Sequence, residues 1–180
     1  LAPFVDWRSI AEDPDYTLTI TEGEKKAAKA TIEGITTIGL GGVWSFGAKK
    51  QNIEFLPTLE EFTWSGRTVH IIYDSDAAAN ADVRKAALAL ADLLIARGAV
   101  VHVGYLPTIH GGKVGLDDYL VANSADDFLA WLEDVPEAGA SRALHKMNEE
   151  VTYIMDPGIV VINKTGKQLQ PHAFVSPAYA

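Results

Sequence analysis

Short apolar runs alternate with amphipathic or alanine-rich stretches along most of the chain. The apolar, β-branched runs have the length of buried strands and lie at residues 16–21, 35–40, 68–73 and 99–106. The stretches of good helix formers lie at residues 23–33, 58–62, 79–97, 124–133 and 136–150. Strands that are almost wholly apolar and alternate with helices are typical of a parallel sheet covered on both faces. We therefore predict an α/β fold with a mainly parallel, four-stranded sheet and helices on both faces.

The two ends of the chain lack this alternation. Residues 1–15 carry two prolines and no sustained period, so we predict an irregular lead-in. From Val151 onward, short apolar segments are separated by turn residues at 156–158 and 165–166, which predicts a β-hairpin. The expected organisation is a lead-in over 1–15, a main α/β domain over 16–135, and a helix and hairpin over 136–180 that form an annex or begin a neighbouring domain.

Composition narrows the class of protein. With 180 residues, 48% of them hydrophobic, the chain can bury a core, and general disorder is excluded. A net charge of -9 argues against nucleic-acid binding through a broad basic face, but it is compatible with metal-bridged contact to phosphates. The absence of cysteine excludes disulfides and thiolate zinc sites and favours a cytoplasmic location.

Two further features concern the setting of the chain. Its longest apolar stretches are far shorter than the roughly 20 residues of a membrane-spanning helix, so we expect no membrane partner. The chain begins at Leu1 and not at methionine, and we therefore expect it to be part of a longer polypeptide.

Acidic residues follow three of the predicted strands. Glu22 follows the first strand, Asp74 and Asp76 follow the third, and Asp117 lies beyond the fourth. Ligands of open parallel sheets bind beyond the carboxyl ends of the strands, so these side chains are candidates for one site. Carboxylate oxygens from separate segments favour Mg²⁺, with Mn²⁺ as a substitute. In extended backbone, Asp74 and Asp76 would point the same way, as two ligands of one ion require.

These motifs resemble the TOPRIM domain, the catalytic module of bacterial-type primases, type IA and type II topoisomerases and some nucleases. The resemblance rests on Glu22 in ITEGEKKA, on Asp74 and Asp76 in VHIIYDSDAAA, and on Asp117 in the later GLDDYL. It covers residues 16 to 122 and is most like the TOPRIM-like domains of plasmid and phage primase-helicase replication proteins. It implies that Glu22 is a general acid or base and that the three aspartates are metal ligands.

The resemblance also implies a function: metal-dependent phosphoryl or nucleotidyl transfer on nucleic acid, as part of a DNA primase or primase-helicase. The expected partners are DNA or RNA held through metal-bridged phosphates, a nucleoside triphosphate in the case of a primase, and a helicase or other replication domain. Two alternatives stay open. One is a TOPRIM nuclease that hydrolyses phosphodiesters, and the other is a catalytically silent scaffold that binds a metal or a helicase partner.

Basic residues near the predicted site could contact a phosphate backbone, and Trp44 and Phe46 could stack on bases. The candidates for nucleic-acid contacts are Lys25, Lys49, Lys50 and Arg84. A solvated helix face and a loop packed by its own aromatic side chains explain the same residues equally well.

Overall fold

The computed structural model describes residues 2–109, 111–139, 151–154, 159–162 and 167–169. The chain divides into two compact units, Leu1–Ala138 and Gly139–Ala180, and each is described by itself. The strands of the first unit form a four-stranded, all-parallel sheet in the order β2-β1-β3-β4, which confirms the predicted fold class. Their bounds are β1 (Leu18–Glu22), β2 (Thr37–Leu40), β3 (Thr68–Tyr73) and β4 (Val100–Tyr105).

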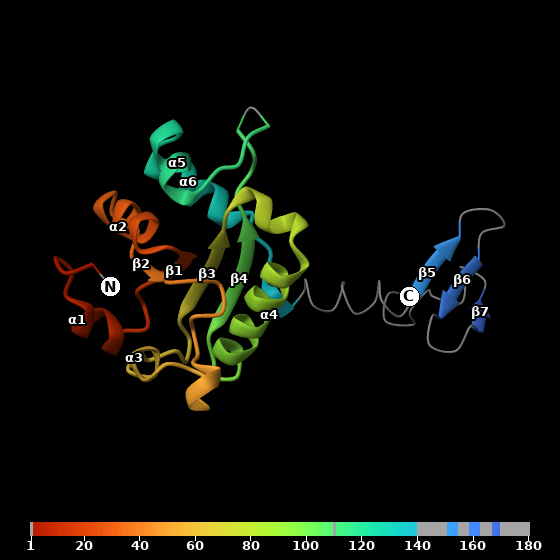
Figure 1. The fold of residues 1–180 in the computed structure, drawn as a ribbon, viewed down its shortest axis with the longest axis horizontal. Coiled ribbons are helices and arrows are strands. Elements are labelled where there is room, and N and C mark those ends of the chain that lie inside the picture. The colour runs from red at the N-terminus through yellow and green to blue at the C-terminus, as the bar shows by residue number, and fades with distance from the viewer. Residues whose placement is uncertain (1, 110, 140–150, 155–158, 163–166, 170–180) are drawn as a thin grey trace, which may run out of the picture. The chain divides into compact units, whose positions relative to one another are not determined.

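Helices cover both faces of this sheet. The helices are α1 (Trp7–Glu12), α2 (Glu24–Ile32), α3 (Pro57–Glu60), α4 (Ala81–Ile95), α5 (Leu116–Ala122) and α6 (Ala125–Glu133), with short 3₁₀ turns η1 (Lys49–Gln51) and η2 (Ser75–Ala79). Figure 1 shows α2, α5 and α6 on one side of the sheet and α4 on the other. The carboxyl ends of β3 and β4 point upward in this view, toward the loop that connects β4 to α5.

The strands build two cores because their side chains alternate between the faces. On β3, Val69, Ile71 and Tyr73 enter the core beneath α4, whereas Ile72 enters the core beneath α5 and α6. Ile71 and Ile72 are both completely buried. A strand that is buried on both faces needs apolar residues at nearly every position, and this continuous apolar run is the pattern that predicted it.

Gly39 brings the start of α2 against β2. A Cβ at this position would lie 2.9 Å from the Ala27 Cβ and 2.9 Å from the Gly23 carbonyl oxygen, closer than real contacts allow. The missing side chain lets the first turn of α2 lie directly on the sheet. This packing places the early residues of α2 next to the carboxyl ends of the strands.

The predicted irregular lead-in is wrong for residues 7–12, which form α1. Asp6 caps this helix by accepting a hydrogen bond from the Ser9 amide, and Ile10 and Ala11 are buried. A helix of 6 residues is too short to show a helical period in the sequence. Its C-terminal carbonyls are held from within the fold: the guanidinium of Arg67 donates to the carbonyl oxygens of Ile10 and Ala11.

The second unit contains a small antiparallel sheet, in the order β5-β6-β7. Its strands are β5 (Val151–Ile154), β6 (Ile159–Ile162) and β7 (Lys167–Leu169), and the pairing of β5 with β6 confirms the predicted hairpin. Most of the predicted helix over 136–150 and the predicted turns at 156–158 and 165–166 lie outside the described residues. Among the helices that the structure describes, none is both long enough and apolar enough to cross a membrane.

Candidate functional site

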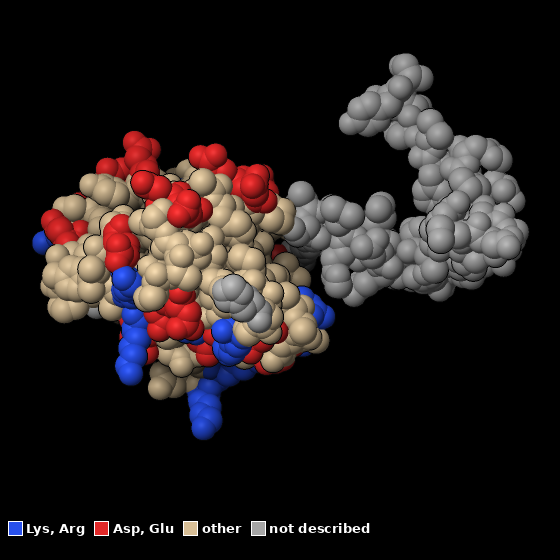
Figure 2. Space-filling view, turned by 90° about the horizontal axis from the view of Figure 1, so that it is seen from above, with Lys and Arg blue, Asp and Glu red and all other residues tan. Residues whose placement is uncertain are grey.

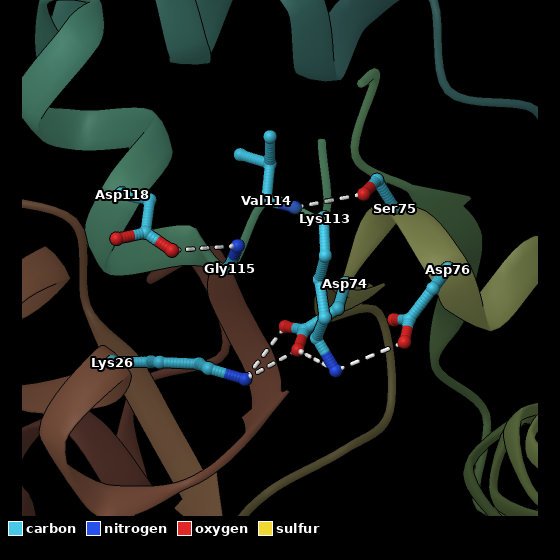
Figure 3. A network of polar contacts seen from close by, with 8 residues as sticks. All are labelled: Lys26, Asp74, Ser75, Asp76, Lys113, Val114, Gly115 and Asp118. Carbon is cyan, nitrogen blue, oxygen red and sulfur yellow. Dashed lines mark hydrogen bonds and ion pairs between the residues drawn. The ribbon is translucent and has the colours of Figure 1, made fainter. Parts of the chain in front are cut away.

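Asp74 stands at the carboxyl end of β3 and is only 6% exposed. Its carboxylate accepts hydrogen bonds from one ammonium group: Lys26 Nζ lies 2.6 Å from Oδ1 and 2.7 Å from Oδ2. Lys26 comes from α2, whose first turn Gly39 allows onto the sheet. Figure 3 shows the two side chains directed at each other from separate elements. A carboxylate that is nearly buried thus has a bidentate cationic partner, as burial of its charge requires.

A second lysine joins Asp74 to Asp76. Lys113 Nζ lies 3.0 Å from Asp76 Oδ2 and 3.3 Å from Asp74 Oδ2, so both carboxylates share one cation (Figure 3). The side chain of Lys113 is 61% exposed and that of Asp76 is 56% exposed. The hydrogen bond with Asp76 is the largest influence on Lys113 and raises its pKa, and the contact with Asp74 acts in the same direction.

The two segments that carry these residues are joined through their backbones. The Ser75 amide donates to the Val114 carbonyl oxygen at 3.0 Å, and the Val114 amide donates to Ser75 Oγ at 2.9 Å. The expected extended backbone through Asp76 is wrong, because η2 begins at Ser75. Asp74 and Asp76 nevertheless reach the same ammonium group, since the short turn keeps both at the same edge of the sheet.

Asp117 lies beside the Lys26 side chain. A Cβ added to Gly115 would be 2.8 Å from Asp117 Oδ1 and 3.0 Å from Lys26 Cε, so both atoms lie close to one point above this glycine. Gly115 also donates its amide to Asp118 Oδ2 at 3.2 Å, which ties down the first turn of α5. Asp117 and Lys26 therefore both lie against Gly115.

Glu22 ends β1, where it is half-buried and paired in register with Leu40 of β2. Its carboxylate influences the neighbouring strand: burial raises the pKa of Tyr73, and the charges of Glu22 and Tyr105 raise it further. The Tyr73 hydroxyl is buried and has no hydrogen-bond partner in the structure. Glu22 is thus near Tyr73, the residue before Asp74, whose hydroxyl is buried and unpaired.

Two carboxylates can share one cation in this site, but a larger cluster is not assembled. Within the described ranges, no three Asp, Glu, His or Cys side chains are grouped closely enough to hold a metal ion. The predicted set of three aspartates therefore does not form such a group. The pair of Asp74 and Asp76 does fit Mg²⁺, because this ion is commonly held by one or two carboxylates, with water and substrate phosphates as its other ligands.

The predicted nucleic-acid contacts come from three elements, α2, η1 and α4. Lys25 is exposed on α2. Arg84 of α4 donates to the Ala78 carbonyl oxygen at 2.6 Å, just beyond Asp76. Lys49 and Lys50 belong to η1.

Lys49 borders a groove of about 680 Å³ between the segment around η1 and α4. Its ammonium lies 4.9 Å from the centre of the Trp44 ring, and Trp44 donates to Asp82 Oδ2 at 3.0 Å. Phe46 is 6% exposed, so it offers no free face for stacking on a base. Phe46 therefore packs inside the protein, whereas Trp44 contacts Lys49 of η1 and Asp82 of α4.

The sequence interpretation missed Lys26 and Lys113 as partners of the carboxylates. Neither lysine is among the candidate residues that the sequence pattern indicated. A signal was present: one lysine lies in the first turn after β1 and the other lies in the loop after β4, both at the edge where the carboxylates were expected. Figure 2, which views the molecule from above this edge, shows acidic side chains spread over much of the described surface, with Lys and Arg among and below them.

The fold and site define an α/β domain whose parallel sheet ends in a network of carboxylates and lysines. The chain belongs to the family described as Domain of unknown function (DUF3854), whose model matches residues 6–127. Comparison with curated protein sequences gives no match.

Among solved structures, the chain is similar to the Aquifex aeolicus primase, in a crystal structure of its zinc-binding and RNA polymerase domains. The identity is 17% and the TM-score is 0.45, over 67% of this chain. The chain spans about a quarter of the length of that primase chain, 26%. The similarity is distant.

Proposed function

We propose that this domain carries out metal-dependent phosphoryl transfer on nucleic acid, as the TOPRIM-like domain of a primase or primase-helicase. One observation carries the proposal: Asp74 and Asp76 converge on a single cationic atom at the carboxyl edge of a parallel sheet. This edge is where ligands of such sheets bind. The two carboxylates provide hard oxygen ligands of the kind that Mg²⁺ prefers.

Each residue of the site has a role in this proposal. Asp74 and Asp76 would hold Mg²⁺, which when bound offsets the negative charge of a reacting phosphate. Lys26 keeps the Asp74 carboxylate in one orientation through its two hydrogen bonds. Glu22, half-buried at the end of β1, exchanges a proton with the attacking or leaving hydroxyl. Asp117, which lies against Gly115, is a further candidate ligand.

The first experiment measures Mg²⁺ and Mn²⁺ binding by calorimetry. We expect saturable binding by the chain and loss of binding in the double variant Asp74→Asn/Asp76→Asn. The matched control is Asp15→Asn/Asp126→Asn, which removes two negative charges from exposed positions elsewhere. Equal binding by all three proteins would contradict the proposed site.

Activity assays then separate the reactions. A nuclease cleaves single-stranded nucleic acid in Mn²⁺, and Glu22→Gln abolishes the cleavage. A primase synthesises oligoribonucleotides on a DNA template when the chain is joined to its neighbouring domains, and Asp76→Asn abolishes the synthesis. If the wild type makes no more of either product than these variants do, catalysis is refuted.

A silent scaffold is the second candidate, and one observation favours it. Lys26 and Lys113 already balance the charges of Asp74 and Asp76 without any metal. A site with permanent ion pairs needs no divalent cation. In that case neither metal binds saturably, and Glu22→Gln leaves the activity of the parent protein unchanged.

A further inference from the structure

The two lysines that contact Asp74 differ in exposure and in contact geometry. Lys26 belongs to α2, its side chain is 20% exposed, and it contacts both oxygens of one carboxylate at 2.6 and 2.7 Å. Lys113 lies in a loop, its side chain is 61% exposed, and its contacts are longer, at 3.0 and 3.3 Å. Lys26 is therefore confined by its helix and its bidentate geometry, whereas Lys113 is held mainly by the charges of the two aspartates.

The backbone of Lys113 is anchored even though its side chain is exposed. The next residue, Val114, is buried and exchanges two hydrogen bonds with Ser75, between the two aspartates. Before it, Gly111 has a φ of 75° and Gly112 follows, so the loop turns sharply at residues without side chains. The ammonium can consequently leave the carboxylates by side-chain rotation alone and still remain near the site.

We infer that Lys113 is an exchangeable internal cation: it occupies the position between Asp74 and Asp76 until a divalent cation takes that position, and it then binds a substrate phosphate. The inference rests on the proposed function. An ammonium and a metal ion cannot both occupy the point on which two carboxylates converge, because like charges at a few ångströms repel strongly. Lysine suits such an exchange, since it is a point charge on a flexible stem of four carbons.

Charge balance indicates what the Lys113 ammonium binds after it is displaced. Without metal, the charges of the two aspartates and the two lysines sum to zero. One divalent cation adds two positive charges to these four side chains. A phosphate group that binds the metal supplies the missing negative charge and accepts hydrogen bonds from the Lys113 ammonium.

The test uses Lys113→Ala and two probes, Mg²⁺ alone and inorganic pyrophosphate in saturating Mg²⁺, both by calorimetry. With its competitor removed, Mg²⁺ should bind about threefold to tenfold more tightly, the scale of a pair of exposed ion contacts. Pyrophosphate should bind about tenfold more weakly, because it loses a charged donor. Lys113→Arg should retain the wild-type behaviour toward both probes.

The control Lys85→Ala removes the same charge from an exposed position on α4, and neither affinity should change by more than about twofold. Opposite changes for the two probes, confined to Lys113→Ala, support the exchange. Unchanged Mg²⁺ affinity in Lys113→Ala, or changes of the same sign for both probes, overturn it while leaving the proposed function intact. If neither the wild type nor Lys113→Ala binds Mg²⁺, the proposed function fails as well.

Discussion

The two ends of β3 each bury a charge, and they bury it in opposite ways. Arg67 immediately precedes the strand and is completely buried, and Asp74 immediately follows it and is 6% exposed. The guanidinium of Arg67 donates to main-chain carbonyl oxygens, two of them in α1 and the others at Tyr16 and Thr63. The Asp74 carboxylate is instead held by the side-chain ammonium groups of Lys26 and Lys113.

The difference lies in the kind of partner that each buried charge has. The partners of Arg67 are neutral carbonyls fixed by the backbone, and nothing from solution can replace the cation between them. Burial lowers the pKa of Arg67, but arginine remains charged at any ordinary pH. The partners of Asp74 are side-chain cations, and one of them, Lys113, is largely exposed. The amino end of β3 therefore stabilises the fold, and its carboxyl end is where we propose that a metal ion and a phosphate bind.

The largest effect on stability is expected at Arg67, at the amino end of β3. Arg67→Met leaves several buried carbonyls without a donor and should lower the free energy of unfolding by about 3 to 5 kcal/mol. Urea denaturation measures this change. Arg67→Lys provides the control, because it keeps the charge but cannot reach all four carbonyls, and it should recover only part of the loss. A change below about 1 kcal/mol in Arg67→Met would contradict the assigned role.

The middle of β3 should respond to pH. Burial, together with the stacked ring of His102 at 4.9 Å, lowers the pKa of His70 to about 4. In the unfolded state His70 binds a proton below about pH 6.5, whereas in the folded state it does so only near pH 4. The stability that neutral His70 contributes is therefore fully present above about pH 6.5 and is lost as the pH falls toward 4. The expected loss is about 3 kcal/mol.

Urea denaturation of the wild type and of His70→Leu between pH 7 and pH 4 tests this dependence. The variant should lack this component, so its stability should fall less steeply than that of the wild type as the medium is acidified. Carboxylates titrate in both proteins and cancel in the comparison. Parallel curves for the two proteins would show that His70 does not carry the effect.

At the carboxyl end of β3, Lys26 and Asp74 should be moderately coupled in their effects on stability. A double-mutant cycle of Lys26→Met and Asp74→Asn is expected to give an interaction energy of about 1 to 3 kcal/mol, since both side chains are largely buried. Lys26→Met leaves Asp74 with only its longer contact to Lys113, and Asp74→Asn leaves Lys26 without its carboxylate, so the double variant should be more stable than the sum of the single effects indicates. Additive effects would mean that the pair is not held in solution.

The smallest effect is expected for the exposed pair. The cycle of Lys113→Ala and Asp76→Asn should give less than about 1 kcal/mol, because both side chains are more than half exposed. This coupling should fall further in high salt, whereas that of Lys26 with Asp74 should persist. A coupling as large as that of Lys26 with Asp74 would remove the distinction between a fixed and an exchangeable lysine.

The sequence pattern predicted the strands well because each is a short apolar run that must be buried on both faces. It placed Asp74 and Asp76 correctly at the end of β3, since a carboxylate after a buried strand lies at the sheet edge. It failed at α1, which is too short to show a period and which depends on Arg67, far along the chain. It did not pair Lys26 with Asp74, because 48 positions separate them in the chain and the position of Lys26 after β1 indicates only the same sheet edge.

Local information thus determined the α/β class, the parallel sheet and the acidic residues at its carboxyl edge, because periodicity and residue type are properties of neighbours in the chain. Tertiary structure alone decided which cations face Asp74 and how firmly each is held. Those contacts depend on packing between distant segments. Gly39, which has no side chain, lets α2 pack closely on the sheet, and the hydrogen bonds between Ser75 and Val114 hold Lys113 at the same edge. No pattern of neighbouring residues contains these distances.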